Sequence, residues 1–232
     1  MCRQKERVCG VQMQLRIDDI GLTPYGRALE LQNQLVEQRK SGEIGDTLVL
    51  TEHEAVYTLG RSADDKNVVA DADELQRMGI DVIHVGRGGD VTYHGPGQIV
   101  GYPIIDLSCR EEGVVAYVSG VEEVLIGVLA DYDIEGRRDP ENRGVWIGNE
   151  KIAAIGVRVT RSVTMHGFAL NVSVDLSHYG GIVPCGIVGK GVTSLDRLVP
   201  SVDMAQVKKR IIVRFSEVFG YEEHESGGGA GH

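Results

Sequence analysis

Two segments with a helical spacing of apolar residues enclose a strand-rich stretch, and this arrangement limits the folds open to the chain more than any other feature. Apolar side chains recur with the helical period over 113–131 and from Met204 to Val218, which predicts two amphipathic helices. Between them, apolar runs predict strands at 144–147, 151–160 and 164–172. Because these strands follow one another through short turns, the pattern favours a mixed α+β fold with antiparallel hairpins over a repeating βαβ fold.

The N-terminal half predicts further elements of both kinds. Thr23 and Pro24 are a favourable helix start, with threonine as the cap and proline in the first turn. The predicted elements are a strand at 13–17, a helix at 25–40, a strand at 47–51, a helix at 71–78 and a strand at 81–85.

No internal repeat or interior low-complexity linker divides the sequence. Residues 1–224 are therefore predicted to form one domain, which is within the size that a single core supports. Residues 225–232 hold no hydrophobic side chain larger than alanine and are expected to be a disordered glycine-rich tail. With 31 glycines among 232 residues, against a usual share of about 7%, many tight turns are expected.

Charge and cysteine content limit the partners and the compartment. The net charge of −10 argues against nucleic acid or an anionic membrane as the default partner. Cysteines at positions 2, 9, 109 and 185 show no C-x-x-C spacing, which favours a reducing compartment. The N-terminus lacks the apolar core of a secretion signal, and no stretch is expected to approach the ~18 apolar residues of a membrane span, so a cytoplasmic protein is predicted.

The stretch Arg87 to Gln98 is rich in chemistry and poor as core material. It places arginine, aspartate, histidine and glutamine among four glycines and a proline. Glycine allows the backbone to approach a ligand closely, while the polar side chains supply hydrogen-bond donors and acceptors. A ligand-binding loop is one interpretation, leading into a strand at 99–107; a plain glycine-rich hairpin is the alternative.

Cys185 stands between Pro184 and Gly186 in an otherwise apolar run, where a thiol has little reason to be needed for packing. Proline and glycine favour a tight turn that presents the sulfur to a cavity. A buried structural thiol is the alternative, since free cysteine is among the most often buried residue types.

A set of motifs in order and spacing resembles the lipoyl(octanoyl) transferase family of lipoate biosynthesis. Residues 87–98 match that family's R-G-G-x-x-T-x-H-x-P-G-Q signature at every fixed position. The other motifs are Gly144-Val145-Trp146, Lys151-Ile152-Ala153-Ala154-Ile155-Gly156, His166-Gly167-Phe168-Ala169-Leu170-Asn171, Pro184-Cys185-Gly186 and Thr193-Ser194-Leu195, with looser similarity at Glu52-His53 and Tyr57 to Arg61.

The resemblance implies an acyltransferase with the fold of the biotin and lipoate protein ligase catalytic domains, a central mixed sheet flanked by helices. It implies transfer of an octanoyl group from octanoyl-acyl carrier protein to a lysine of apo-lipoyl domains, in 2-oxoacid dehydrogenase complexes or the glycine cleavage H protein, through a thioester on Cys185. The sequence itself holds no complete phosphate-binding or dinucleotide motif and no metal-ligand constellation, so neither a nucleotide cofactor nor a metal is predicted. The substrate-binding residues it implies are Arg87, Gly88, Gly89, Asp90, Val91, Thr92, Tyr93, His94, Ala154, Ile155, Gly156, Gly167, Phe168 and Ala169.

The group that activates Cys185 differs between the two lines of reasoning. A free thiol, with a pKa of about 8.5, needs a nearby base or cation to form the thiolate. Spacing alone favours His94 or His166, by analogy with Cys-His pairs. The resemblance instead implies Lys151, giving a Cys/Lys dyad, while the two histidines orient substrate or serve as satisfied core residues. Oxyanion donors stay open among the backbone amides of Gly156, Gly186 and the loop glycines.

Three other functions compete with octanoyl transfer. A lipoate or biotin ligase would form an acyl-adenylate and need ATP, a cysteine thioesterase would resolve the same intermediate with water, and an acyl-binding module would do neither. The implied protein partners are usually acidic, so docking would need a local basic patch; Arg61, Arg87, Arg158 and Arg161 are the candidates.

Overall fold

The computed structural model describes residues 14–110, 113–183 and 190–222. Its centre is an eight-stranded mixed sheet in the order β1-β2-β6-β10-β9-β8-β7, with β11 paired to β9 off this path. The strands are β1 (Arg16–Leu22), β2 (Thr47–Glu52), β6 (Gln98–Ile104), β7 (Arg137–Arg138), β8 (Val145–Ile147), β9 (Glu150–Thr160), β10 (Val163–Asn171) and β11 (Gly191–Val192).

Pairing in this sheet is mostly antiparallel. Strands β6, β10, β9 and β8 run antiparallel to their neighbours, whereas β1 pairs with β2 and β11 pairs with β9 in parallel. The tight turn between β9 and β10 places Arg161 and Ser162 at positive φ, as a two-residue hairpin of this kind requires. The predicted hairpin-rich mixed sheet is confirmed.

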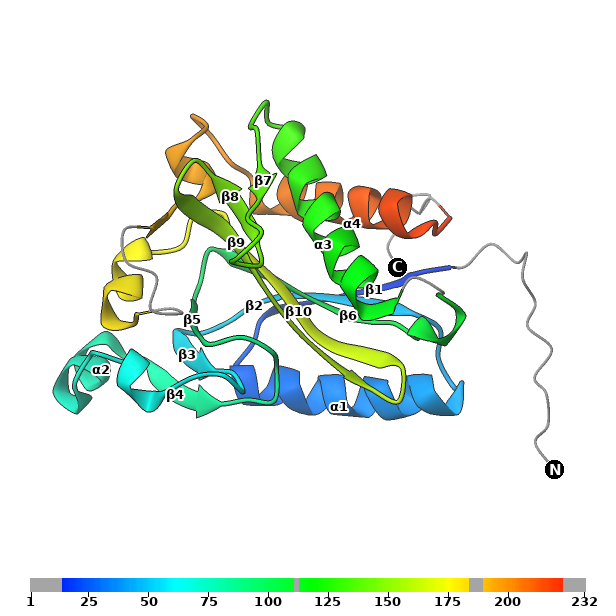
Figure 1. Ribbon diagram of the computed structural model, residues 1–232, viewed down its shortest axis with the longest axis horizontal. Coiled ribbons are helices and arrows are strands. Elements are labelled where there is room, and N and C mark those ends of the chain that lie inside the picture. The colour runs from blue at the N-terminus through cyan, green and yellow to red at the C-terminus, as the bar shows by residue number, and fades with distance from the viewer. Residues whose placement is uncertain (1–13, 111–112, 184–189, 223–232) are drawn as a thin grey trace, which may run out of the picture.

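Helices cover both faces of the large sheet (Figure 1). Helix α1 (Tyr25–Ser41) packs on one face, chiefly against β10 and β6. Helices α3 (Gly113–Ala130) and α4 (Met204–Phe219) pack against each other and cover the opposite face. The central mixed sheet flanked by helices, expected from the sequence, is therefore confirmed.

A second sheet of three strands lies beside the large one. It has the order β4-β3-β5, built from β3 (Val56–Leu59), β4 (Asp81–His84) and β5 (Val91–His94), with α2 (Ala72–Met78) next to it. Its own apolar cluster includes Tyr57, Leu59 and Tyr93. Because β5 lies within 87–98, this stretch is a loop followed by a strand rather than a loop throughout.

The other predicted elements fall close to their expected bounds, with three corrections. The strand predicted at 99–107 ends at Ile104, and residues Leu107–Cys109 form a 3₁₀ helix. Strand β1 begins at Arg16 and extends to Leu22, beyond the predicted 13–17. Thr23 does not cap α1, because its hydroxyl donates to the carbonyl of Ile20 and Pro24 occupies the N-cap position. Asp71, by contrast, caps α2 through a reciprocal capping box with Glu74.

Helix α3 is long and apolar enough to cross a membrane, so the expectation that no segment approaches such a span is wrong by length and composition. Its packing explains the composition. Val121, Val124 and Leu125 are fully buried against the sheet and α4, and the helix also carries the buried carboxylate of Glu122. A core helix of a folded domain passes the same composition test.

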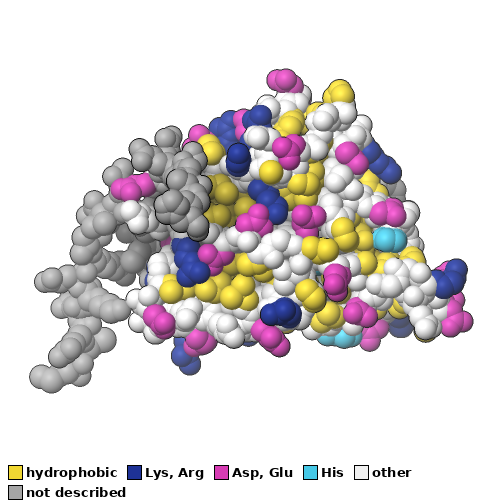
Figure 2. Space-filling view, turned by 180° about the vertical axis from the view of Figure 1, so that it is seen from behind, with side chains coloured by type: hydrophobic (Ala, Val, Ile, Leu, Met, Phe, Trp, Pro, Cys, Tyr) yellow, Lys and Arg dark blue, Asp and Glu magenta, His cyan; other side chains and the backbone are white. Residues whose placement is uncertain are grey.

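Surface charge is mixed on the face drawn in Figure 2, where Asp and Glu side chains lie among Lys and Arg with apolar side chains between them. Of the four arginines considered for a basic patch, Arg61, Arg158 and Arg161 are exposed. Arg87 is only 7% exposed, so its assignment to a docking surface is wrong.

Candidate active site

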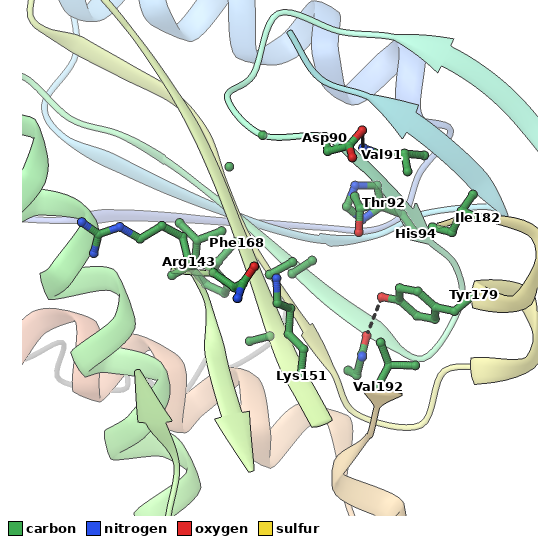
Figure 3. A pocket seen from close by; sticks show the side chains of 18 of the residues that line it. Asp90, Val91, Thr92, His94, Arg143, Lys151, Phe168, Tyr179, Ile182 and Val192 are labelled. Carbon is green, nitrogen blue, oxygen red and sulfur yellow. Dashed lines mark hydrogen bonds between the residues drawn. The ribbon is translucent and has the colours of Figure 1, made fainter. Parts of the chain in front are cut away.

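A cavity of about 850 Å³ lies between β9 and β10 of the large sheet and β5 of the small sheet (Figure 3). The segment 141–143 and the 3₁₀ helix Leu176–Gly181 complete its walls. In Figure 3, Lys151 points into the cavity from β9 while Asp90, Thr92 and His94 lie on the facing wall. Residues far apart in the sequence are thus brought to one open cavity.

Most of the residues that the sequence predicted for the site line this cavity. They are Arg87, Gly89, Asp90, Val91, Thr92, His94, Lys151, Ala154, Ile155, Gly156, Gly167, Phe168 and Ala169. Gly88 and Tyr93 lie behind the wall: the Gly88 amide donates to the Val157 carbonyl at 3.0 Å, and the Tyr93 hydroxyl is 2.7 Å from Nδ1 of His178.

Cys185 lies outside the described residues, as do Pro184 and Gly186. The chain on either side of this segment does reach the cavity, since Ile182 and Val183 before it and Lys190 and Gly191 after it all line the wall.

Arg87 is anchored in the wall through Thr58 of β3. Its Nη2 donates to the Thr58 carbonyl at 2.6 Å and to the Thr58 hydroxyl at 2.9 Å, and its Nη1 donates to the Gly88 carbonyl at 3.0 Å. A buried guanidinium held in this way places a fixed positive charge at the cavity. Thr58, in the looser Tyr57-to-Arg61 motif, had no role assigned from the sequence.

Asp90 is held by a residue that sequence reasoning missed. Asn67 Nδ2 lies 2.9 and 2.8 Å from the two carboxylate oxygens of Asp90, and the Val91 amide donates to the same carboxylate at 2.7 Å. The carbonyl of Asn67 also accepts from the Val183 amide at 2.8 Å. Asn67 therefore ties the glycine-rich loop to the chain that approaches Cys185.

The glycines of β9 and β10 permit close approach of backbone. A Cβ at Gly167 would lie 2.2 Å from the Gly101 carbonyl oxygen, and one at Gly156 would lie 2.9 Å from that of Gly88. Both contacts are with backbone, which cannot move aside as a flexible side chain can. These two predicted site residues are thus required for the packing of the wall itself.

A network of polar side chains links the elements beside the cavity. Gln98 Nε2 donates to Asn171 Oδ1 at 2.9 Å and lies 3.1 Å from the Tyr179 hydroxyl, which in turn donates to Asn171. Asn171 Nδ2 donates to the Thr193 carbonyl at 3.0 Å. This network fixes β6, β10 and the 3₁₀ helix to one another, and neither Tyr179 nor Asn171 was assigned a role from the sequence.

Three histidines are buried at or next to the cavity. His94 lies 2.7 Å from Gln98 Oε1 through Nδ1, and His53 contacts the Thr23 carbonyl and the Tyr102 hydroxyl at 2.7 and 2.6 Å. Both ring nitrogens of His166 are buried without a hydrogen-bond partner among the described residues, and its backbone has a positive φ of 56°.

Burial disfavours the charged form of all three histidines. It lowers the pKa of His94 to about 3 and the pKa values of His53 and His166 to about 4; His53 adds to the effect at His94, and Arg87 and Arg158 add to it at His166. Near neutral pH these imidazoles are therefore uncharged. A neutral histidine supplies no positive charge to stabilise a thiolate.

These pKa values predict acid destabilisation. Unfolded histidine titrates near pH 6.5, so below that pH the unfolded chain binds protons that the folded chain does not. Stability should be fully present above about pH 6.5 and decline as the pH falls toward 4, by about 2 kcal/mol per buried histidine at pH 5. Urea denaturation at pH 7.5 and 5.0 measures this loss.

The variant His53→Gln should show a smaller difference between the two pH values than the natural chain, because one buried titrating group is gone. His84→Gln is the matched control, since the side chain of His84 is 70% exposed. An equal pH dependence in the natural chain and in His53→Gln would contradict the assignment.

No group of three or more His, Cys, Asp or Glu side chains arranged to hold a metal ion occurs within residues 14–110, 113–183 and 190–222. The cavity wall instead carries apolar side chains together with neutral imidazoles, two lysines, two arginines and two carboxylates, those of Asp90 and Glu141. This set suits an apolar chain bearing a polar, acyl-type end.

Comparison with known proteins identifies the class. Residues 24–216 match the family model of the lipoyl protein ligase A/B catalytic domain. Among solved structures, a bi-partite lipoate protein ligase from Thermoplasma acidophilum superposes with a TM-score of 0.73 at 18% identity, covering 92% of this chain and 87% of that one. A biotin protein ligase from Aquifex aeolicus gives a TM-score of 0.51 at 11% identity, covering 90% and 69%. At these identities the structures show the shared fold alone, which is the fold that the sequence predicted.

Sequence similarity narrows the class further. The chain is 48% identical over 212 residues to a protein from Alkaliphilus metalliredigens named octanoyltransferase, covering 90% of this chain and 97% of that one. The chain belongs to the octanoyltransferase family within the lipoyl protein ligase A/B group.

Proposed function

We propose that this protein transfers an octanoyl group from octanoyl-acyl carrier protein to a specific lysine of apo-lipoyl domains, through an S-octanoyl intermediate on Cys185. Membership of the octanoyltransferase family supports octanoyl transfer, and the lipoate ligase relatives support an acyl donor and a lipoyl-domain acceptor. The single observation that carries the proposal is the cavity, which joins Lys151 to the predicted acyl-binding residues and to both ends of the segment that holds Cys185.

The cycle has two half-reactions. In the first, the Cys185 thiolate attacks the thioester carbonyl; a carbon–sulfur bond to Cys185 forms while the bond to the carrier's thiol breaks, and the departing thiolate takes the proton held by Lys151. In the second, the acceptor amine attacks the S-octanoyl carbonyl. A carbon–nitrogen bond forms, Cys185 leaves as thiolate, and Lys151 takes the proton that the amine loses.

The environment of Lys151 supports its part in both steps. Its side chain is half-buried and projects into the cavity, whose wall also holds the anchored guanidinium of Arg87. A lysine held partly out of water can exchange a proton more readily than an exposed one. The histidines considered as alternatives are buried in their neutral form, which favours Lys151 over them as the cation beside a thiolate.

We also propose lipoyl domains of 2-oxoacid dehydrogenase complexes or the glycine cleavage H protein as acceptors, and the cytoplasm as the compartment. The cytoplasm is supported by the four cysteines, which show no C-x-x-C spacing and no disulfide framework. Acidic carriers would dock against exposed arginines, of which Arg61, Arg158 and Arg161 are available on the surface.

One assay separates the competing functions. Purified protein is mixed with octanoyl-acyl carrier protein and an apo-lipoyl domain, with and without ATP, and the masses of both proteins are followed. Octanoyl transfer gives the modified lipoyl domain equally in both arms. Modification that needs ATP would indicate a ligase, release of free octanoate would indicate a thioesterase, and no change in either protein would indicate an acyl-binding module.

A further inference from the structure

Trp146 is the single tryptophan of the chain and lies in the wall of the cavity. It belongs to β8, is only 2% exposed, and its Nε1 donates to the Asn142 carbonyl at 2.9 Å. The ring is therefore fixed in orientation by burial and by this hydrogen bond.

Two lysine ammonium groups contact this ring. Nζ of Lys151 lies 4.8 Å from the ring centroid and Nζ of Lys190 lies 4.7 Å from it. Both distances are within the ~6 Å over which an aromatic face attracts a cation, and tryptophan is the best of the aromatic side chains for this interaction. Trp146 pairs with Lys151 across β8 and β9, while Lys190 directly precedes β11 on the other side of β9.

Lys190 already has a counter-charge. Its Nζ lies 2.5 Å from Oδ2 of Asp139. Asp139 also accepts from the amides of Glu141 and Asn142 and from Asn142 Nδ2, and the ammonium of Lys190 holds its pKa well below the usual range. The positive charge of Lys190 is thus balanced by a fixed carboxylate.

We propose that Trp146 is a positioning residue for Lys151, because its ring holds the Lys151 ammonium inside the cavity. The ion pair with Asp139 holds the Lys190 ammonium against the same ring and fixes the backbone just before β11. The positioning role rests on the proposed function of Lys151. The attraction acts only on the protonated amine, so the ring stabilises the form of Lys151 that accompanies a thiolate and releases it once the proton has moved.

The cavity holds other charged or titratable side chains besides Lys151, and each of them contributes to the pH dependence of fluorescence and of activity. The charged or titratable side chains lining the cavity are Tyr25, Arg87, Asp90, His94, Tyr102, Glu141, Arg143, Lys151, His166, Tyr179 and Lys190. The test therefore compares variants that differ at one of the two lysines alone.

Because the chain has one tryptophan, its fluorescence reports on this contact directly. Emission is recorded against pH for the natural chain, Lys151→Gln and the matched variant Lys190→Gln. Lys190 and the tyrosines also contribute to the alkaline change in emission, so the comparison isolates one component of it. We expect the component caused by deprotonation of Lys151 to be present in the natural chain and in Lys190→Gln and to be missing from Lys151→Gln. Identical transitions in the natural chain and in Lys151→Gln would overturn the proposal.

Transfer kinetics give a second readout. Trp146→Leu removes the aromatic face and should lower kcat by on the order of three- to thirty-fold with little change in KM, whereas Trp146→Phe should recover part of the rate because it keeps a ring. Phe215→Leu is the matched control, since it removes a fully buried aromatic ring of α4 from the core. It should reduce stability without changing the pH profile of kcat.

The two proposals fail in different ways. If Lys151→Gln transfers octanoate at the natural rate, the role of Lys151 in the proposed function is wrong. If Lys151→Gln is inactive while the tryptophan transition does not depend on Lys151, or Trp146→Leu keeps the natural kcat, only the positioning role of Trp146 is wrong.

Discussion

Replacement of Cys185 by serine should abolish the acyl-enzyme intermediate and lower octanoyl transfer by at least about 10³-fold, as expected for loss of a nucleophile. A serine hydroxyl at this position would be essentially fully protonated at neutral pH, and a lysine cation that stabilises a thiolate is a poor base for it. Intact-mass measurement after incubation with octanoyl-acyl carrier protein should show one octanoyl addition on the natural chain and none on Cys185→Ser.

The other cysteines provide the controls. Cys109→Ser should keep both the adduct and the transfer rate, because Cys109 ends the 3₁₀ helix Leu107–Cys109 and stands outside the motifs that carry the family resemblance. Hydroxylamine should release the adduct, as it does a thioester. Peptide mapping that placed the octanoyl group on Cys109 or Cys9 would show that the nucleophile has been misassigned.

Helices with a strong local pattern were predictable from the sequence, whereas the short strands β3 and β5 were not. The period of apolar residues in α3 and α4 is a local signal, so both helices fall within a residue or two of their predicted ends. Strands β3 and β5 have four residues each, too few for a period to show, and their pairing joins residues such as Val56 and His94 that lie far apart in the chain. The predicted N-cap at Thr23 is wrong because of a contact that the local sequence does not reveal: the Thr23 hydroxyl donates to the Ile20 carbonyl instead.

The candidate site divides in the same way. Arg87, Lys151 and the glycines near them were found because they stand in motifs with a specific order and spacing. Trp146 also stands in a motif, but the contact of its ring with Lys151, like that of Asn67 with Asp90, is created only by the folded chain. A lone asparagine in a polar stretch carries no signal of such a role, and a tryptophan in a strand is most simply explained as core.

Replacing Lys151 by alanine should slow both acylation and transfer while leaving the fold intact, because a half-buried side chain at the cavity contributes little to the core. The reason is electrostatic. A positive charge within about 4–6 Å stabilises a thiolate by one to several pKa units, so its loss should move the pKa of Cys185 toward the free value of about 8.5. At pH 7 this reduces the thiolate fraction, and alkylation by iodoacetamide should slow by about tenfold or more.

Lys151→Arg separates the charge from the proton transfer. Arginine keeps the positive charge but does not give up a proton near neutral pH, so this variant should retain much of the fast alkylation while losing turnover. The histidine alternatives enter the same experiment as His94→Ala and His166→Ala. Because burial holds both imidazoles in their neutral form, neither variant should shift the pH profile of alkylation at Cys185. A profile that moves only in a histidine variant would replace the Cys/Lys dyad by a Cys/His pair, and the neutral imidazole would then have to act as the base that takes the thiol proton.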